Sequence, residues 1–283
     1  MGMTFGAHLS IAGGYEKALE RAAAIGANCL QMFSGNPRSF SGPTVGDTVG
    51  KAFAKKAKEF GVAPVYFHAP YLVNLASEEM TGELSEKLLI KELKAAAFMG
   101  VRGSIVHLGS FKKAEGEEKE RQYTLLIERV TTILEETPKA PLFIIENAGT
   151  RKIGQTMEEI AGIIREVKGH GQRLQVCLDT CHLHAAGYDI SSKEKLDDFL
   201  ALFDKLIGLE KLECFHINDS RDEFGSLRDR HDNIGEGKIP KDVFRLALNH
   251  PKLKALPFLL EVPGFDDQGP DKKNLDLLKA MVE

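Results

Sequence analysis

Six apolar runs of this chain end in side chains that can bind a metal ion. A typical run is Val65-Tyr66-Phe67, which is followed by His68 and has the apolar pattern of a strand buried on both faces. The end residues are His68, His107, Glu146, Asp179, His216 and Glu261. One such histidine is more often a hydrogen-bonded core residue than a ligand, but six strand ends of this kind are not expected by chance. Imidazole and carboxylate groups suit Zn, Mn or Fe, so the pattern predicts metal-dependent chemistry.

The spacing of these end residues predicts the elements that position them. Consecutive end residues lie 33 to 45 positions apart, which is the length of one strand plus one helix. Helical periodicity is found at 15–25, 47–60, 85–99, 119–136, 156–167, 193–207, 241–248 and 272–281. Two further strands, expected at 4–8 and 28–33, complete eight βα units and predict a TIM (β/α)8 barrel of the α/β class, a single domain over 1–283.

The barrel explains why the six residues would meet. Parallel strands bring their C-terminal ends to one face, which is the face that carries the active site in TIM barrels. An open doubly wound sheet is the alternative, but the segment 10–14 after the first strand lacks the G-x-G-x-x-G spacing typical of that fold. The barrel is therefore favoured.

Three more ligand-type residues bring the set to nine. His182 follows Asp179 by three positions, and Asp229 and His231 fall in a loop between the seventh and eighth strands. One zinc ion takes three or four protein ligands, so nine ligands suit a cluster of two or three ions, and a closed four-cysteine site is excluded. The other residues of these types are expected outside the ligand set: His8 packed beside the ligands, Cys181 as a packed thiol, and His170, His184 and His250 on the surface or in loops.

Composition is compatible with this interpretation. The chain has 43% hydrophobic and 28% charged residues, no apolar run of transmembrane length and no pattern of a secretory signal at its N-terminus. Its 4 cysteines do not have the spacing of a disulfide framework, which favours a cytoplasmic protein. The net charge of −4 argues mildly against a polyanionic partner, but three bound divalent cations would reverse its sign.

Two longer motifs resemble signatures of the endonuclease IV family of apurinic/apyrimidinic (AP) endonucleases. The first is CLDTCH at 177–182 followed by AAGYD at 185–189. The second combines HINDS at 216–220, GS at 225–226, DRH at 229–231 and IGEG at 234–237. Glu146 within IEN and Glu261 within LLE fit the remaining strand ends, and the resemblance extends from Gly6 to Glu261.

The resemblance implies a DNA repair enzyme with three zinc ions. Such an enzyme hydrolyses the phosphodiester 5′ to an abasic site in duplex DNA with a metal-bridging hydroxide, leaves a 3′-OH and also trims blocked 3′ ends. By position, the first zinc would take His68, His107 and Glu146; the second Glu146, Asp179, His216 and Glu261; and the third His182, Asp229 and His231. Glu146 would set the metal spacing and Glu261 would orient the metal of the hydroxide, which makes these two residues catalytic.

The resemblance also implies DNA-contacting loops and a monomer that acts on double-stranded DNA. The matching positions are Arg38, Tyr71 and Leu72, with Arg228 and Arg230 as further phosphate contacts. For Tyr71 and Leu72 the alternative is ordinary loop packing. The sequence departs from the family pattern at Phe40, where a tryptophan is frequent, and in the loop 147–151, which has fewer glycines.

Two other functions remain open on the sequence. A sugar isomerase or epimerase of the xylose-isomerase-like barrels would need only Glu146, Asp179, His216 and Glu261, which suffice for one Mn²⁺ or Mg²⁺. It would leave the other five ligand-type residues without a shared metal. A metal-dependent DNA-binding protein without catalytic activity is the third possibility, but a metal cluster with open coordination argues against it.

Overall fold

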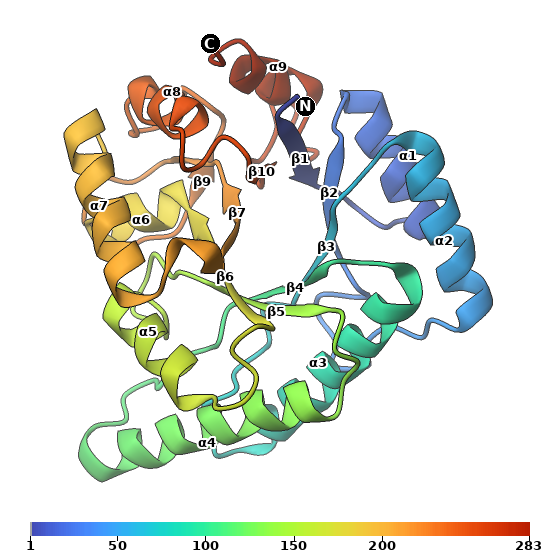
Figure 1. Ribbon diagram of the computed structural model, residues 1–283, viewed down its shortest axis with the longest axis vertical. Coiled ribbons are helices and arrows are strands. Elements are labelled where there is room, and N and C mark those ends of the chain that lie inside the picture. Colours follow the sequence, from blue (N-terminus) through green and yellow to red (C-terminus); the bar gives the residue numbers. More distant parts are fainter. Residues whose placement is uncertain (1) are drawn as a thin grey trace.

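The eight strands expected from the sequence close into a parallel barrel (Figure 1). The computed structural model describes residues 2–283. The barrel strands are β1 (Thr4–His8), β2 (Cys29–Phe33), β3 (Val65–His68), β4 (Gly103–Val106), β5 (Leu142–Glu146), β6 (Leu174–Asp179), β7 (Leu212–His216) and β10 (Pro257–Leu260). Each pairs with its neighbours in chain order, and β1 closes the barrel by pairing with β10, with Phe5 opposite Phe258. The predicted TIM barrel is confirmed.

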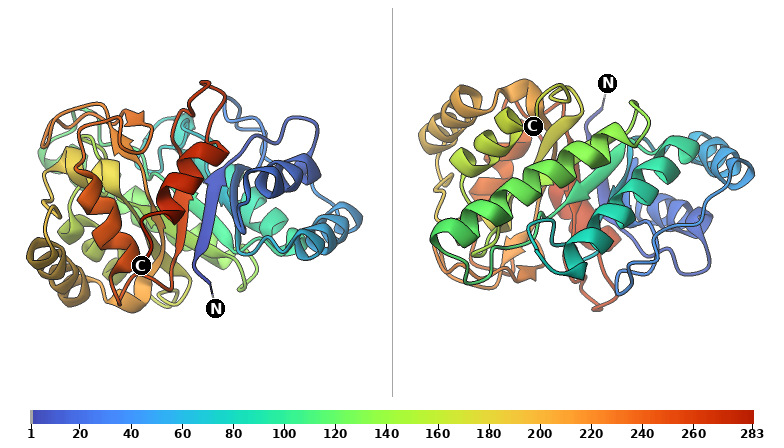
Figure 2. Two further views of the ribbon diagram at one scale, coloured as in Figure 1. Left: turned by 90° about the horizontal axis from the view of Figure 1, so that it is seen from above. Right: turned by 90° about the horizontal axis from the view of Figure 1, so that it is seen from below.

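Helices surround the barrel, and Figure 2 shows them outside the strands. They are α1 (Tyr15–Ile25), α2 (Asp47–Phe60), α3 (Met80–Met99), α4 (Gly116–Glu135), α5 (Met157–Glu166), α6 (Thr180–Ala186), α7 (Lys193–Leu206), α8 (Lys241–Asn249) and α9 (Lys272–Lys279), with a 3₁₀ turn η1 (Leu209–Lys211). Four of them, α1, α2, α3 and α6, end at Gly26, Gly61, Gly100 and Gly187, which adopt the left-handed conformation common at helix C-termini. No helix within residues 2–283 is both long and apolar enough to cross a bilayer.

The structure differs from the expected elements mainly around the ligand residues. His107 and Glu261 lie one position beyond β4 and β10, and α3 begins at Met80, five residues before the expected start. Helix α6 was not expected; it follows β6 without a loop because the Asp179 side chain accepts a hydrogen bond from the His182 backbone N–H, at 3.1 Å. A short antiparallel pair, β8 (Asp219–Ser220) with β9 (His231–Asp232), was also missed.

The interior of the barrel below the ligand residues is apolar and contains thiols. Cys29, Tyr66, Cys177 and Cys214 are fully buried there, and all four cysteines of the chain are free. His250, expected on the surface or in a loop, lies in the loop directly after α8, but its side chain is buried and only 5% exposed. It follows the end of α8, where its Nε2 lies 2.9 Å from Oδ1 of Asp197 on α7.

Candidate metal centre

The nine predicted ligand residues converge at the C-terminal mouth of the barrel. Their ligand atoms form three groups, and within each group these atoms lie within 4.8 Å of one another. The groups are His68, His107 and Glu146; Glu146, Asp179, His216 and Glu261; and His182, Asp229 and His231. The first two groups share Glu146, so the carboxylate of this residue joins them.

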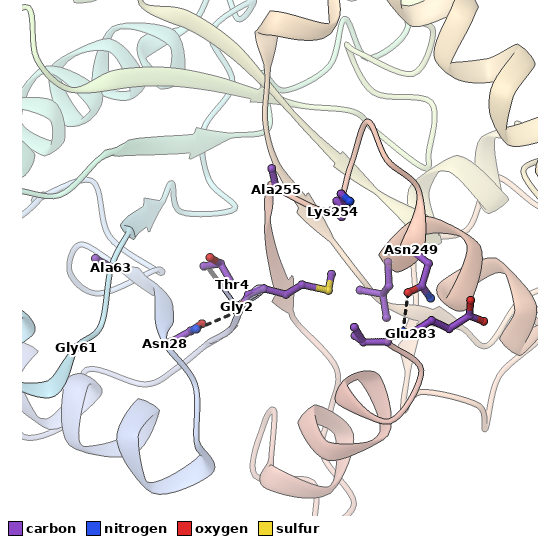
Figure 3. Close-up of a pocket in the computed structure, with 12 residues that line it drawn as sticks. Gly2, Thr4, Asn28, Gly61, Ala63, Asn249, Lys254, Ala255 and Glu283 are labelled. Carbon is purple, nitrogen blue, oxygen red and sulfur yellow. Dashed lines mark hydrogen bonds between the residues drawn. The ribbon is translucent and has the colours of Figure 1, made fainter.

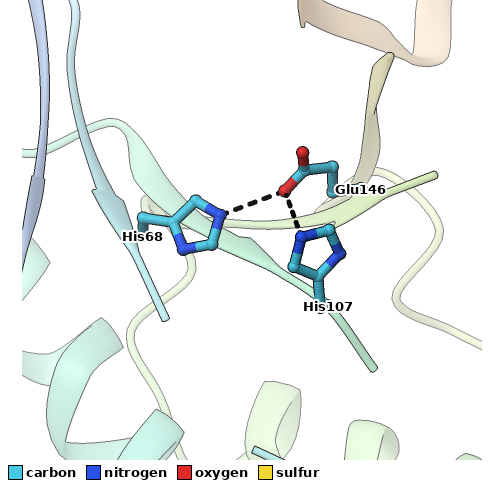
Figure 4. Close-up of side chains that lie close together, drawn as sticks. All are labelled: His68, His107 and Glu146. Atoms are coloured by element: carbon cyan, nitrogen blue, oxygen red, sulfur yellow. Dashed lines mark hydrogen bonds and ion pairs between the residues drawn. The ribbon is translucent and has the colours of Figure 1, made fainter. Parts of the chain in front are cut away.

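Glu146 lies at the centre of the cluster. Its Oε2 atom lies 3.0 Å from Nε2 of His68 and 3.2 Å from Nε2 of His107, and Figure 4 shows both rings directed at this one oxygen. Its Oε1 atom lies 3.1 Å from Nδ1 of His216 and 3.3 Å from Nδ1 of His182. The carboxylate is fully buried and makes these contacts with four imidazoles, an arrangement suited to bridging two cations.

Backbone carbonyl groups orient two of the imidazoles. The Nδ1–H group of His68 donates to the carbonyl of Ala69, at 2.8 Å, and that of His231 donates to the carbonyl of Glu261, at 3.2 Å. Each bond uses the Nδ1–H group, so Nε2 is the ring atom that faces the carboxylates and is available to a metal ion. Histidines that ligate metals are held by hydrogen bonds of this kind.

The third group is built from segments outside the barrel strands. His182 is on α6, and its Nε2 lies 3.1 Å from Oδ1 of Asp229, which lies 3.3 Å from Nε2 of His231. The loop after β5 lies close against this helix, because a Cβ atom on Gly149 would come within 2.9 Å of the Cα atom of His182. Cys181 is buried, and its sulfur lies within 4.8 Å of ligand atoms of Asp179 and His231.

Asp219 anchors the loop that follows the third group. Its carboxylate accepts hydrogen bonds from the backbone N–H groups of Gly235, Gly237 and Ile239, at 2.9 to 3.1 Å. A Cβ atom on Gly237 would lie 2.4 Å from the carbonyl oxygen of Ser220, so only glycine fits there. These contacts give a structural reason for the IGEG motif at 234–237.

Charges within the cluster shift the protonation of its members. Burial alone would raise the pKa of Glu146, but the charges of His107 and His216 hold it well below its usual range. Burial lowers the pKa of His107 to about 4, so at pH 7 the positive charge beside Glu146 comes from histidines whose pKa is raised, including His216 and His182. Burial would also lower the pKa of His216, but Glu261 and Glu146 raise it well above the ordinary histidine value.

The same balance holds in the third group. Burial opposes the protonation of His182 and His231, but Asp179 and Asp229 raise the pKa of both imidazoles well above the ordinary value. Protons on these histidines therefore neutralise buried carboxylates in the metal-free protein. Divalent cations would take over that role and displace the protons.

Unpaired ring nitrogens also support metal binding by these residues. The ring atoms Nδ1 of His182 and Nε2 of His231 are buried, and although each lies 3.3 Å from a carboxylate oxygen, neither makes a contact of hydrogen-bond geometry within residues 2–283. Buried polar atoms are rarely left without a partner, and an unpaired one often marks an ion or water. Nitrogen and carboxylate oxygen ligands without a thiolate set are typical of catalytic zinc.

A cavity of about 420 Å³ opens over the cluster. Its wall includes Tyr71, Phe33 and Pro270 together with His107 and His231. A larger cavity, about 760 Å³, lies at the opposite end of the barrel beside the two chain termini (Figure 3). It is lined by residues such as Thr4, Asn28 and Lys254 and by none of the nine ligand residues, so we place the chemistry at the smaller cavity.

The predicted DNA-contacting residues lie on loops after the barrel strands. Tyr71 is 74% exposed, and Leu72 is 37% exposed. Arg38 is exposed in the loop after β2, and the Arg228 side chain is 70% exposed. The Arg230 guanidinium is held by Asp222 through contacts of 2.6 and 2.8 Å. Arg230 therefore stabilises the loop that carries Asp229.

Two polar residues beside the ligands were missed by the sequence analysis. Gln31 on β2 and Asn218 after β7 are both fully buried. Asn218 donates to Oδ2 of Asp179, at 2.6 Å, and accepts from the backbone N–H of Glu261, at 2.7 Å. A polar residue within or directly after an apolar strand was the available signal for both.

Comparison with known proteins places the chain in a family. Residues 19–281 match the family model described as xylose isomerase-like TIM barrel. The chain is 38% identical to "Probable endonuclease 4" of Thermosipho melanesiensis, with 92% of each chain covered, and 37% identical to that of Halothermothrix orenii, with 98% and 99% covered.

Solved structures agree with this placement. Endonuclease IV from Thermus thermophilus superposes with a TM-score of 0.82 at 34% identity over 98% of each chain. A D-tagatose 3-epimerase-like protein superposes with a TM-score of 0.71 at 19% identity over 99% of this chain and 97% of that one, which is a likeness of fold alone. The chain therefore belongs to the endonuclease IV family of AP endonucleases, within the xylose isomerase-like TIM barrels.

Proposed function

We propose that the protein is a zinc-dependent AP endonuclease that cleaves the phosphodiester 5′ to an abasic site in duplex DNA and leaves a 3′-OH. The same site would trim blocked 3′ ends, which also present a phosphodiester or phosphate. The observation that carries the proposal is the position of Glu146, whose two oxygens lie within 3.3 Å of imidazoles from all three ligand groups. A cluster joined in this way suits an anionic phosphate whose charge grows in the transition state.

We assign one zinc ion to each of the three ligand groups. When bound, zinc would polarise the phosphodiester and lower the pKa of a bound water to roughly 7. Glu146 sets the distance between the first two positions because each of its oxygens faces a different pair of histidines. Glu261 is the catalytic partner: its Oε2 atom lies 3.5 Å from Nδ1 of His216, on the wall of the cavity. All nine ligands come from one chain, which supports a monomer.

Recognition of the abasic site would come from the loops beside the cavity. The Tyr71 ring packs edge-on against Phe33, with centroids 5.5 Å apart, and lies 6.4 Å from the ring of His68. An abasic nucleotide lacks stacking and pairing, so extruding it toward the metals costs less than flipping a normal one. Tyr71 and Leu72 would fill the gap left in the duplex, and Arg38 and Arg228 would contact phosphates.

An isomerase or epimerase is the second candidate because one metal in the second ligand group could serve it. The third group argues against this function. Its residues His182, Asp229 and His231 are brought together by α6, β9 and the loop before β9. An isomerase with a single metal would not need these three ligands.

The test is a nicking assay on a duplex oligonucleotide with one abasic site, run beside metal analysis. The wild-type protein should contain about three zinc ions per chain and cut the abasic strand at a single position. Prolonged chelation and His182→Ala should both abolish cutting. His184→Ala is the matched control, because His184 is on the same helix but its Nε2 contacts the carbonyl of Asp222 instead of a ligand. A zinc-loaded protein that leaves the abasic duplex intact would refute the assignment.

A further inference from the structure

Gln31 is an amide side chain at the mouth of the barrel, surrounded by residues of the candidate metal centre. It is fully buried on β2, where its neighbours in sequence are apolar. Its Oε1 lies 2.7 Å from Nε2 of His216, and its Nε2 contacts Oε1 of Glu261 and lies 2.9 Å from Nδ1 of His8. Every polar atom of this side chain is thus used inside the site.

The chemistry of the partners fixes the orientation of the amide. An ionised carboxylate can only accept hydrogen bonds, so the NH₂ group of Gln31 must face Glu261. The amide oxygen must then face His216 and accept a proton from Nε2 of that ring. The same NH₂ group lies 2.9 Å from Nδ1 of His8, which is also 3.3 Å from Oε1 of Glu261.

This orientation fixes which nitrogen of His216 is free. With Nε2 donating to Gln31, the ring turns Nδ1 toward Glu146, at 3.1 Å, and toward Oε2 of Glu261, at 3.5 Å, so Nδ1 is the atom that can bind a cation once its proton is displaced. Gln31 likewise occupies Oε1 of Glu261, which leaves Oε2 facing His216. One amide therefore sets two ligand atoms of the second group, Nδ1 of His216 and Oε2 of Glu261.

We propose that Gln31 is a positioning residue for the second metal, holding His216 with its proton on Nε2 and Glu261 by Oε1, so that Nδ1 and Oε2 face the cation. Hydrogen-bond partners of metal ligands typically change metal affinity by 10- to 100-fold when they are removed. The inference rests on the metal binding proposed above. Gln31 is fully buried, so it cannot contact DNA itself.

The experiment compares Gln31→Met with Gln122→Met. Methionine keeps the approximate length of the side chain and removes its hydrogen bonds. Gln122 is a matched control because it is also buried, at 8% exposed, but it is on α4, where its Nε2 lies 3.4 Å from Glu118. Three measurements are made on zinc-loaded protein: zinc affinity by chelator competition, the ¹⁵N-imidazole NMR spectrum, and kcat and KM for an abasic duplex.

For Gln31→Met we expect one zinc ion to bind roughly 10- to 100-fold more weakly. The imidazole spectrum should lose the slowly exchanging Nε2 proton of His216 that the wild-type protein shows. At zinc concentrations that fill the other two sites, kcat should fall while KM stays within about 2-fold, because substrate binding does not involve the amide. Gln122→Met should match the wild-type protein in all three measurements.

Gln31→Glu separates the two contacts and remains informative if Gln31→Met does not fold. A glutamate at this position can still accept the proton of His216 but cannot donate to Glu261. We expect this variant to keep the protected Nε2 proton of His216. One zinc should bind more weakly, because the new carboxylate and that of Glu261 then repel each other.

Unchanged zinc affinity in Gln31→Met, or in Gln31→Glu where Gln31→Met does not fold, would overturn the inference. So would a retained Nε2 proton in a folded Gln31→Met protein. These outcomes are distinct from a failure of the proposed function, in which the wild-type protein itself would bind no zinc or leave the abasic duplex uncut.

Discussion

Oε1 of Glu146 lies 3.1 Å from Nδ1 of His216, and both side chains are fully buried at the barrel mouth. The two residues end β5 and β7, which do not pair because β6 lies between them. Their contact therefore crosses the mouth of the barrel instead of following a strand pair. It links the first ligand group to the second, and several predictions about the centre depend on it.

Glu146→Gln should disrupt two of the three ligand groups at once. The amide keeps the size of the carboxylate but loses the charge that both cations would share. We expect nicking of an abasic duplex to fall by more than about 100-fold, beyond the usual effect of losing a residue that only supports a ligand. Metal analysis should show loss of zinc from the chain. A variant that retained full zinc content and activity would contradict the bridging role.

The metal-free protein should lose stability as pH rises above neutrality. The pKa values of His182, His216 and His231 are raised above the ordinary 6.5, so their contribution is complete below pH 6.5 and is lost as pH rises through the raised values. The pKa values of Glu146 and Glu261 are lowered from 4.5, so their contribution is lost only in acid.

Zinc should reverse this trend because it binds the deprotonated imidazoles. The difference in Tm between zinc-loaded and metal-free protein should therefore widen from pH 6 to pH 9. Thermal unfolding of both forms across this range is the measurement. A metal-free protein that became more stable over that interval would show that the histidines are neutral in the folded state.

Tyr71→Ala should weaken binding of abasic DNA without affecting the metals. The ring is 74% exposed beside the cavity and contributes no ligand atom. Stacking of an aromatic side chain on a base is worth about 1–3 kcal/mol, so we expect a loss of affinity of roughly 10-fold. Phe98→Ala is the control, because Phe98 is 48% exposed near the far end of α3. Equal losses in the two variants would remove Tyr71 from the recognition surface.

Glu92→Gln should stabilise the protein at alkaline pH. Glu92 on α3 is fully buried, with Oε1 2.9 Å from the Ser104 hydroxyl, and burial raises its pKa from 4.5 to about 7. Glu92 thus holds its proton more tightly in the folded protein than in the unfolded chain. The free energy of unfolding therefore falls as pH rises from 4.5 to 7. That difference in pKa corresponds to roughly 3 kcal/mol.

The glutamine variant has no proton to lose and should avoid most of this penalty. We expect its free energy of unfolding to exceed that of the wild-type protein by about 1–3 kcal/mol at pH 8 and to differ little at pH 5. Denaturant titrations at the two pH values make the comparison. The same effect at both values would rule out ionisation of Glu92 as its cause.

The strand-end residues show how much of the site local sequence could predict. A buried parallel strand is apolar on both faces, so a histidine or carboxylate at its end is conspicuous, as at His68 and Glu146. The regular spacing then indicated the barrel, which the closed sheet confirms. The family predicted from the two longer motifs is likewise confirmed by the relatives.

Other features depended on contacts between distant segments. His250 was expected on the surface or in a loop. It does lie in a loop, but its burial against Asp197, 53 positions away, could not be predicted. Gln31 was not predicted as part of the site because it is a single polar residue in an apolar strand. Its partners His216 and Glu261 are 185 and 230 positions away.

The sequence by itself thus determined the fold class, the family and the candidate ligands, because periodicity, strand ends and short motifs are properties of neighbouring residues. Only the tertiary structure decided that Gln31 faces His216 and Glu261. That arrangement requires β1 to pair with β10 and β2 to pair with β1, which sets the register of three strands from opposite ends of the chain. Local periodicity carries no information about that register, because it arises from closing the barrel.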